Sequence, residues 1–204
     1  MSASNPVRYR VAECAEVLGS SSVAAVDRRA VEGMPSWRAR ESLASRTLLR
    51  ELLGELADTT IAKEPGGRPF LPDHPWIGVS MSHSGAWVAA GVGEHLQVGV
   101  DVEVPNAPVN PALLRRCCRA EDAAAFEAMP DDVRTTEFTW LWTVQEACVK
   151  ASGQGLAGRP WTVPVAVGQT SGTWGRVAWT ALRGQAPVPV SCAWTVTDER
   201  EGSD

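Results

Sequence analysis

Carboxylates and a lysine stand at spacings that could bind a metal ion and a phosphate. Asp101 and Glu103 are two residues apart in the alternating run LQVGVDVEV (96–104), so on a strand both carboxylates point to one side. That spacing suits one hard cation, and it equally suits a strand with one solvated face. In TWLWTVQEACVKASG (139–153), Glu146 and Lys150 share one helix face. An exposed ion pair would explain them too, but their apolar neighbours predict partial burial, where charges need partners or a function.

Two further segments could bind phosphate. In SMSHSG (80–85), His83 lies between serines at a turn, where it could act as a neutral hydrogen-bonding ring or as a cation. GGRPFLPD (66–73) offers unhindered backbone and the planar guanidinium of Arg68. Each signal is weak alone. The chain has no Walker A loop, no dinucleotide fingerprint and no G-x-S-x-G elbow, which argues against nucleotide-loop enzymes and serine hydrolases.

Hydrophobic periodicity predicts the elements that must position these residues. Residues 37–57 form an amphipathic helix, because apolar residues recur every four positions from Ala44 to Leu56. Strands are expected at 6–18, 76–85, 86–93 and 96–104, with a structured Gly/Pro-rich loop at 63–75. The prolines of VPNAPVNP (104–111) predict a linker, followed by helices at 111–129 and about 133–152 and short strands within 161–197. Each half therefore offers a helix followed by strands, which predicts two similar α+β lobes, 1–104 and 105–204.

Composition narrows the class of protein. The 204 residues are 44% hydrophobic and 21% charged, as in ordinary globular chains. The net charge of −5 argues against a nucleic-acid partner. The charge is distributed unevenly: residues 28–50 contain six arginines and two glutamates, and residues 101–146 contain nine acids and four arginines. A basic and an acidic patch suit an anionic ligand that carries a metal, and they equally suit two solvated faces.

Location and redox state are also predicted. No apolar stretch approaches the ~20 residues of a membrane helix, and residues 1–14 lack the apolar core of a signal peptide, so a cytoplasmic protein with no membrane partner is expected. Five cysteines without a C-x-x-C pair predict buried, reduced thiols rather than disulfides or a zinc site. Lysine is rare, and Lys63 and Lys150 are the two in the chain.

Taken in order, the motifs resemble a known family. GRPFLPDHPWIGVSMSHSGAWVAAGVGEHLQVGVDVE (67–103), then WTVQEACVKASGQGL (142–156), with SRTLLRELL (45–53) upstream, is similar to the 4′-phosphopantetheinyl transferases of the surfactin-synthetase (Sfp) type. The pattern requires G-[KR]-P, S-H-S, G-[IV]-D-[IV]-E and W-x-x-K-E-[AS]-x-x-K in that order. The resemblance covers roughly residues 35–160, and four motifs in register make it specific.

The resemblance implies a Mg²⁺-dependent enzyme that moves phosphopantetheine from coenzyme A to a serine of an acyl or peptidyl carrier protein, as in polyketide or nonribosomal peptide biosynthesis, and releases 3′,5′-ADP. It implies a pseudo-twofold pair of α/β lobes, each a small, mostly antiparallel sheet packed on a long helix, with the site in the cleft. Its implied site residues are Asp101, Glu103 and Glu146 for Mg²⁺; Arg46, Thr47, Arg68, Ser82, His83 and Lys150 for coenzyme A; and Glu146, Lys150 and His83 for catalysis.

The roles within that set are specific. Glu146 is the expected base for the carrier serine, and Lys150 would neutralise the pyrophosphate and the departing 3′,5′-ADP. His83 would bind the 3′-phosphate, while Arg46 and Thr47 would contact the adenosine end. Such chemistry depends on charge neutralisation and in-line positioning more than on covalent help.

One departure from the family pattern leaves alternatives open. Gln145 stands where the family has a lysine, and loss of that cation could weaken phosphate binding or change how Glu146 is held. A coenzyme A-binding or carrier-binding protein with little catalysis is one alternative. A Mg²⁺-dependent hydrolase of phosphoanhydrides or of the phosphopantetheine link is another. A monomer is expected, since one chain supplies both lobes.

Overall fold

The computed structural model describes residues 5–154 and 158–196, and the end of the last motif, Gly155 and Leu156, lies outside them. The helices are α1 (Cys14–Ser20), α2 (Ala25–Ala30), α3 (Ser36–Leu53), α4 (Pro111–Cys117), α5 (Ala120–Glu127) and α6 (Asp131–Ser152), with short 3₁₀ turns η1 (Gly54–Leu56) and η3 (Pro160–Thr162). The strands are β1 (Arg8–Glu13), β2 (Ala62–Lys63), β3 (Pro69–Phe70), β4 (Ile77–Ser84), β5 (Trp87–Glu94), β6 (Leu96–Val102), β7 (Ser171–Trp174), β8 (Val177–Ala181) and β9 (Val190–Val196).

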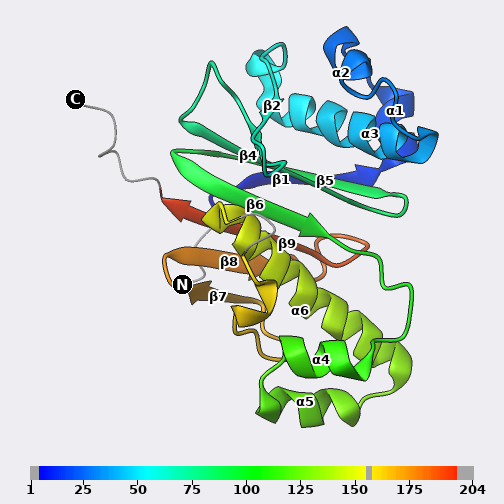
Figure 1. Cartoon of the computed structure of the whole chain (residues 1–204), viewed down its shortest axis with the longest axis vertical. Coiled ribbons are helices and arrows are strands. Elements are labelled where there is room, and N and C mark those ends of the chain that lie inside the picture. The colour runs from blue at the N-terminus through cyan, green and yellow to red at the C-terminus, as the bar shows by residue number, and fades with distance from the viewer. Residues whose placement is uncertain (1–4, 155–157, 197–204) are drawn as a thin grey trace.

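The first sheet is antiparallel, with the order β1-β5-β4, and α3 packs on one of its faces (Figure 1). Leu48 and Leu49 of α3 are fully buried in one cluster with Val79 of β4 and with Val88 and Val92 of β5. The alternation of the strands supplies the other half of this core, because every second side chain points toward the helix.

The second sheet is also antiparallel, with the order β6-β9-β8-β7, and α6 lies across one face of it (Figure 1). Its core joins Val144 and Ala147 of α6 to Trp179 of β8, with Phe126 of α5 at the far side. Each sheet is therefore small, antiparallel and packed on a long helix, so the predicted α+β class is confirmed. The twofold relation between the lobes stays a prediction.

Strand β6 joins the two sheets. It is hydrogen-bonded to β9 in the second sheet, while its Val98, Val100 and Val102 pack in one cluster with Ala89 of β5 in the first. Gly91 keeps this contact close, since a Cβ there would lie 2.4 Å from a methyl carbon of Val100. The proposed lobe boundary at 104 thus follows a strand that is hydrogen-bonded in the second sheet and packs against the first.

Several predicted boundaries differ from the structure. The strand expected over 6–18 ends at Glu13, and α1 replaces its second half. The helix expected over 37–57 runs from Ser36 to Leu53 and then tightens into η1. The loop expected over 63–75 begins at the end of β2 and contains β3, which pairs with β2. The helix expected over 111–129 is two helices, because the backbone is extended at Cys118 and Arg119.

Other expectations from composition have a structural counterpart. All five cysteines are free thiols; four are buried and Cys118 is half-buried. Burial raises the pKa of Cys117 to about 11, so this thiol stays protonated near neutrality. Within the described ranges, no helix is both long enough and apolar enough to cross a membrane.

Candidate functional site

Serines of β4 hold Asp101 of β6 and Glu103, the residue that directly follows β6. The Ser82 hydroxyl donates to Asp101 Oδ1 at 2.8 Å, and the Ser84 hydroxyl donates to Glu103 Oε2 at 2.6 Å. The two serines are two residues apart, as are the two carboxylates, so each set points to one side of its segment and the two sets can meet. Sequence reasoning assigned Ser82 to coenzyme A and did not single out Ser84. The S-x-S spacing opposite D-x-E was the available signal.

Lys150 completes this cluster from α6. Its ammonium donates to Asp101 Oδ1 at 2.6 Å, to Ser82 Oγ at 3.1 Å and to the Val100 carbonyl at 3.1 Å. Asp101 is only 4% exposed, and the ammonium balances its charge where water cannot. The structure therefore brings together Ser82, Asp101 and Lys150 from three elements.

Gly99 allows α6 to come this close to β6. A Cβ at this position would lie 2.0 Å from the Ala147 carbonyl oxygen and 2.6 Å from the Ala151 nitrogen. Both atoms are backbone, so they cannot rotate away. The helix can bring Glu146 and Lys150 over the strand only because residue 99 has no side chain.

Negative charge at the cluster is incompletely balanced. Burial raises the pKa of Glu146, and the charges of Asp101 and Glu103 raise it further against the opposing effect of Lys150. Burial also raises the pKa of Glu103, although its bond from Ser84 opposes this. Asp101 Oδ2 is buried and has no hydrogen-bond partner among the described residues. A divalent cation would relieve all three effects.

The donor set fits Mg²⁺ in part. Within residues 5–154 and 158–196, no three His, Cys, Asp or Glu side chains are grouped closely enough to hold a metal ion by themselves. Mg²⁺ sites in phosphate chemistry commonly use one or two carboxylates, with waters and substrate phosphates completing the octahedron. The unpartnered Asp101 Oδ2 beside Glu103 and Glu146 is compatible with that kind of site.

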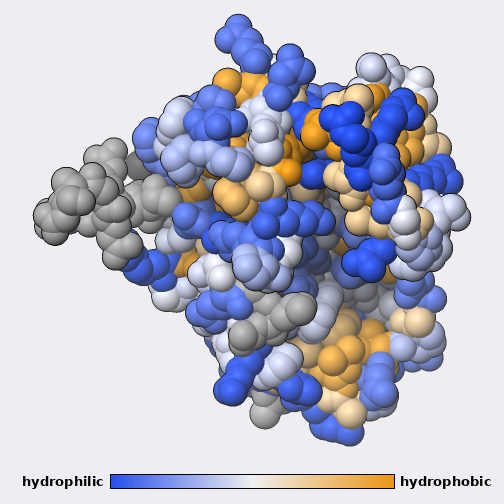
Figure 2. Space-filling model, turned by 45° about the horizontal axis from the view of Figure 1, so that its top comes forward, coloured by the Kyte–Doolittle hydropathy of each residue, from blue (hydrophilic) through white to orange (hydrophobic). Residues whose placement is uncertain are grey.

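A cavity of about 220 Å³ lies beside the cluster. It is lined by Arg68 and its neighbours in the 66–69 loop, by β4 and by Glu146 and Lys150 of α6, with Pro160 at one side. Arg68 also donates a hydrogen bond to the Gln97 side chain. One face of the molecule is hollowed between its upper and lower halves, and hydrophilic side chains gather around the hollow (Figure 2). Thus Arg68, Glu146 and Lys150 share one cavity, as expected for residues of one site.

His83 lies at the end of β4 and contacts α3. Its Nδ1 is 3.3 Å from Glu41 Oε2, and nearly half of the His83 side chain is exposed. Thr47, also on α3, is buried, and its hydroxyl has no hydrogen-bond partner among the described residues. Contact of either residue with coenzyme A stays a prediction.

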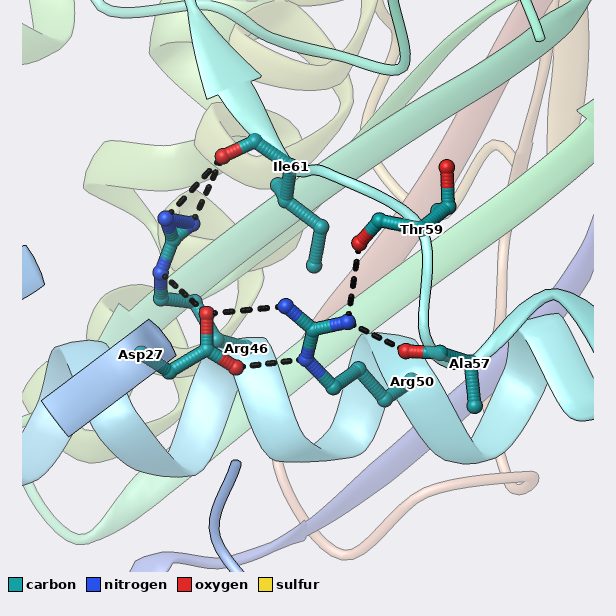
Figure 3. Close-up of polar contacts among 6 residues, drawn as sticks. All are labelled: Asp27, Arg46, Arg50, Ala57, Thr59 and Ile61. Carbon is teal, nitrogen blue, oxygen red and sulfur yellow. Dashed lines mark hydrogen bonds and ion pairs between the residues drawn. The ribbon is translucent and has the colours of Figure 1, made fainter. Parts of the chain in front are cut away.

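Arg46 has protein partners of its own (Figure 3). Its Nε is 3.2 Å from Asp27 Oδ1, and its other nitrogens donate to the Ile61 carbonyl. Burial lowers the pKa of Arg46, and the charge of Asp27 opposes this. The guanidinium points inward, and only 7% of the residue is exposed. Contact between Arg46 and coenzyme A stays a prediction.

The same carboxylate binds Arg50. Asp27 is completely buried and accepts bonds from Arg50 at 2.6 and 3.0 Å, and Arg50 also donates to the carbonyls of Ala57 and Thr59 (Figure 3). Two guanidinium groups from α3 thus hold α2 and the chain after η1. The sequence analysis assigned neither Asp27 nor Arg50 to a site, because no local sequence pattern indicates that an acid on a short helix is buried.

Lys63 adds a cation to this side of the molecule. Burial lowers the pKa of Lys63, and the positive charges of Arg46 and Arg38 lower it further. Two cations of α3 thus act on the Lys63 ammonium of β2. The rarity of lysine was the signal available in the sequence for Lys63.

Gln145 lies away from this cluster. It has no exposed surface, and its Nε2 donates to the carbonyls of Cys117 and Val163 at 2.8 and 3.0 Å. The amide thus connects α6 to the end of α4 and to the chain after η3. Whether the missing cation weakens phosphate binding or changes how Glu146 is held stays a prediction, and the Gln145 side chain packs on another side of the helix.

Comparison with known proteins agrees with the geometry. Residues 97–191 match the sequence model of the 4′-phosphopantetheinyl transferase superfamily, a range that includes the three carboxylates and Lys150. The chain is therefore similar to the 4′-phosphopantetheinyl transferases. It is 27% identical over 124 residues to 4′-phosphopantetheinyl transferase psf-1 of Bacillus pumilus, covering 58% of this chain and 52% of the relative.

Two further relatives carry similar names. The chain is 26% identical to 4′-phosphopantetheinyl transferase Sfp of Bacillus subtilis, covering 58% of this chain and 54% of the relative. It is 33% identical to 4′-phosphopantetheinyl transferase AcpT of Escherichia coli, covering 54% and 56%. The chain thus spans about half the length of the curated relatives it matches. The resemblance to the Sfp type is confirmed.

Proposed function

We propose that this protein transfers the 4′-phosphopantetheine group of coenzyme A to a serine of an apo acyl or peptidyl carrier protein, with Mg²⁺. One observation carries the proposal. Lys150 is ion-paired with Asp101, the charges of Asp101 and Glu103 act on Glu146, and Glu146 and Lys150 line a cavity together with Arg68. Acidic residues with an unsatisfied oxygen, beside two cations and a hollow, suit an anhydride that binds with a metal.

Each residue has a separate role in this proposal. Asp101 through its free Oδ2, Glu103 and Glu146 would hold Mg²⁺, which supplies Lewis-acid polarisation of the pyrophosphate when bound. Ser82 and Ser84 position the first two carboxylates. Glu146 accepts the proton of the carrier serine, directly or through water, and its raised pKa brings it closer to the working range of a base.

The transfer step then balances. The serine oxygen forms a bond to the phosphorus that carries pantetheine, and the bond between that phosphorus and the bridging oxygen breaks. 3′,5′-ADP leaves with the electron pair of the broken bond. Lys150 lies at the cluster where this negative charge develops, and Arg68 offers a planar fork to the phosphate oxygens across the cavity.

The remaining assignments concern the ligand's other end. Ser82 and His83 are proposed to bind the phosphates of coenzyme A, with His83 on the 3′-phosphate, and Arg46 and Thr47 are proposed to contact its adenosine end. The exposed half of the His83 ring and the unpartnered hydroxyl of Thr47 support this. A monomer in the cytoplasm is part of the same proposal.

Intact-protein mass spectrometry of a panel of apo carrier proteins tests the proposal. Each carrier is incubated with the protein, coenzyme A and Mg²⁺, with and without EDTA. The expected result is a mass gain of about 340 Da on at least one carrier, which EDTA abolishes because the step needs the metal. Coenzyme A binding without any gain would overturn the transferase in favour of a binding protein. Release of 3′,5′-ADP without a carrier would indicate a hydrolase instead.

A further inference from the structure

A carboxylate of α3 faces the ring of His83. Glu41 Oε2 is 3.3 Å from His83 Nδ1, and the Glu41 side chain is only 15% exposed. The same oxygen is buried, and no hydrogen bond to it is made within the described residues. The imidazole is thus the group that this oxygen faces, and a buried carboxylate oxygen needs such a neighbour.

We propose that Glu41 is a positioning residue that makes His83 selective for a ribose 3′-phosphate. This inference rests on the proposed function, because it assumes that the exposed side of His83 meets coenzyme A. With Nδ1 facing Glu41, the remaining ring nitrogen, Nε2, is on the opposite edge of the imidazole. The carboxylate therefore decides which edge of the ring is presented to a ligand.

The charges favour this arrangement when a phosphate binds. An imidazolium has two N–H donors, and here one would have the Glu41 carboxylate and the other the phosphate as its acceptor. The ring separates the two anions, so each is closer to the imidazolium than to the other, and attraction exceeds repulsion. A ligand without the 3′-phosphate would make no use of this pair. The result is discrimination between coenzyme A and its 3′-dephospho form.

Calorimetric titration of the full chain with 3′,5′-ADP and with 5′-ADP measures this discrimination without any carrier protein. Glu41→Gln keeps the shape and removes the charge, and Glu41→Ala removes the contact. Both variants are expected to bind 3′,5′-ADP about tenfold more weakly, the loss of one charge-assisted hydrogen bond, while binding of 5′-ADP changes less than about twofold. Glu55→Gln, on the exposed turn η1, is the control for the change in net charge.

A double variant separates positioning from a general effect. If Glu41 acts through His83, then His83→Ala with Glu41→Gln binds 3′,5′-ADP no more weakly than His83→Ala alone. Equal losses for both nucleotides in the Glu41 variants would overturn the proposal, as would unchanged binding of 3′,5′-ADP. Failure of the transferase itself appears in the mass-spectrometric assay, which these titrations do not use. Thermal unfolding of each variant shows whether it is folded.

Discussion

The Lys150 ammonium lies 2.6 Å from Asp101 Oδ1, although the two residues are 49 positions apart in the chain. This ion pair joins the last turn of α6 to β6, and Ser82 of β4 contacts both partners. The candidate site is therefore built at the point where both sheets and the long helix meet. One oxygen of Asp101 is held by Lys150 and Ser82, and the other has no hydrogen-bond partner among the described residues.

Replacing Lys150 by methionine is expected to lower kcat/KM for carrier modification by at least about 100-fold. The side chain keeps its length but loses the charge that balances Asp101 and the developing phosphate charge, and electrostatic donors at such sites contribute about that much. Steady-state transfer assays measure the effect. Arg29→Met removes an exposed cation and is the control. A loss of less than about tenfold would contradict the assigned role.

Glu146→Gln is expected to abolish transfer and yet to stabilise the metal-free protein at pH 7. Because burial and the charge of Asp101 raise the pKa of Glu146, the folded protein binds this proton more tightly than the unfolded chain does. The contribution of Glu146 to stability is thus fully present at pH values below its pKa in the unfolded chain. It is lost as the pH rises through its pKa in the folded protein. The variant avoids that loss.

Melting curves with EDTA at pH 4 and pH 7 measure this difference. The variant should melt about 2 °C or more above the parent at pH 7, the size of a 1 kcal/mol change in a chain of this length, with little difference at pH 4. Glu121→Gln, at an exposed acid, is the control. A variant less stable than the parent at pH 7 would contradict the sign.

Gln145→Lys restores the residue of the family pattern and is expected to change coenzyme A affinity less than about twofold. The side chain faces the carbonyls of Cys117 and Val163, and an ammonium can donate to both. Gln145→Leu removes the donor and should destabilise the fold by about 1–3 kcal/mol. Titration and chemical denaturation measure the two effects. A large gain in rate for the lysine variant would show that the position tunes catalysis.

Gly99→Ala is expected to destabilise the protein by about 1–3 kcal/mol or more, since the new methyl group meets backbone of α6. Transfer should fall as well, because α6 carries Glu146 and Lys150. Gly19→Ala is the matched control: no atom lies within 4 Å of a Cβ there, and alanine favours the helix. Urea denaturation of both variants measures the difference, and equal stabilities would contradict the close approach.

Asp27→Asn leaves two buried guanidinium groups without their counter-ion. Breaking a buried ion pair by removing one partner costs about 3–5 kcal/mol, so the variant should unfold at markedly lower denaturant. Asp73→Asn, at an exposed acid of the 63–75 loop, is the control. A stability within about 1 kcal/mol of the parent would mean that solvent reaches Arg46 and Arg50 despite their low exposure.

Periodicity in the sequence determined which residues share a face. The alternation of Val98 and Val100 with Asp101 predicted a strand with its carboxylate on one side, and the structure has this strand. The four-residue step from Glu146 to Lys150 predicted a helix with both side chains on one face, and the structure has this helix. Order along the chain also made the family recognisable. These properties are local, because backbone geometry alone repeats side chains every two or 3.6 residues.

Tertiary structure decided the partners. No local pattern states that Lys150 meets Asp101, that Arg46 turns inward to Asp27, or that Gln145 points away from the carboxylates. Each contact joins residues far apart in the chain and depends on how closely helix and strand pack. That distance is set by the glycine at 99, and its consequence is visible only when both elements are in place.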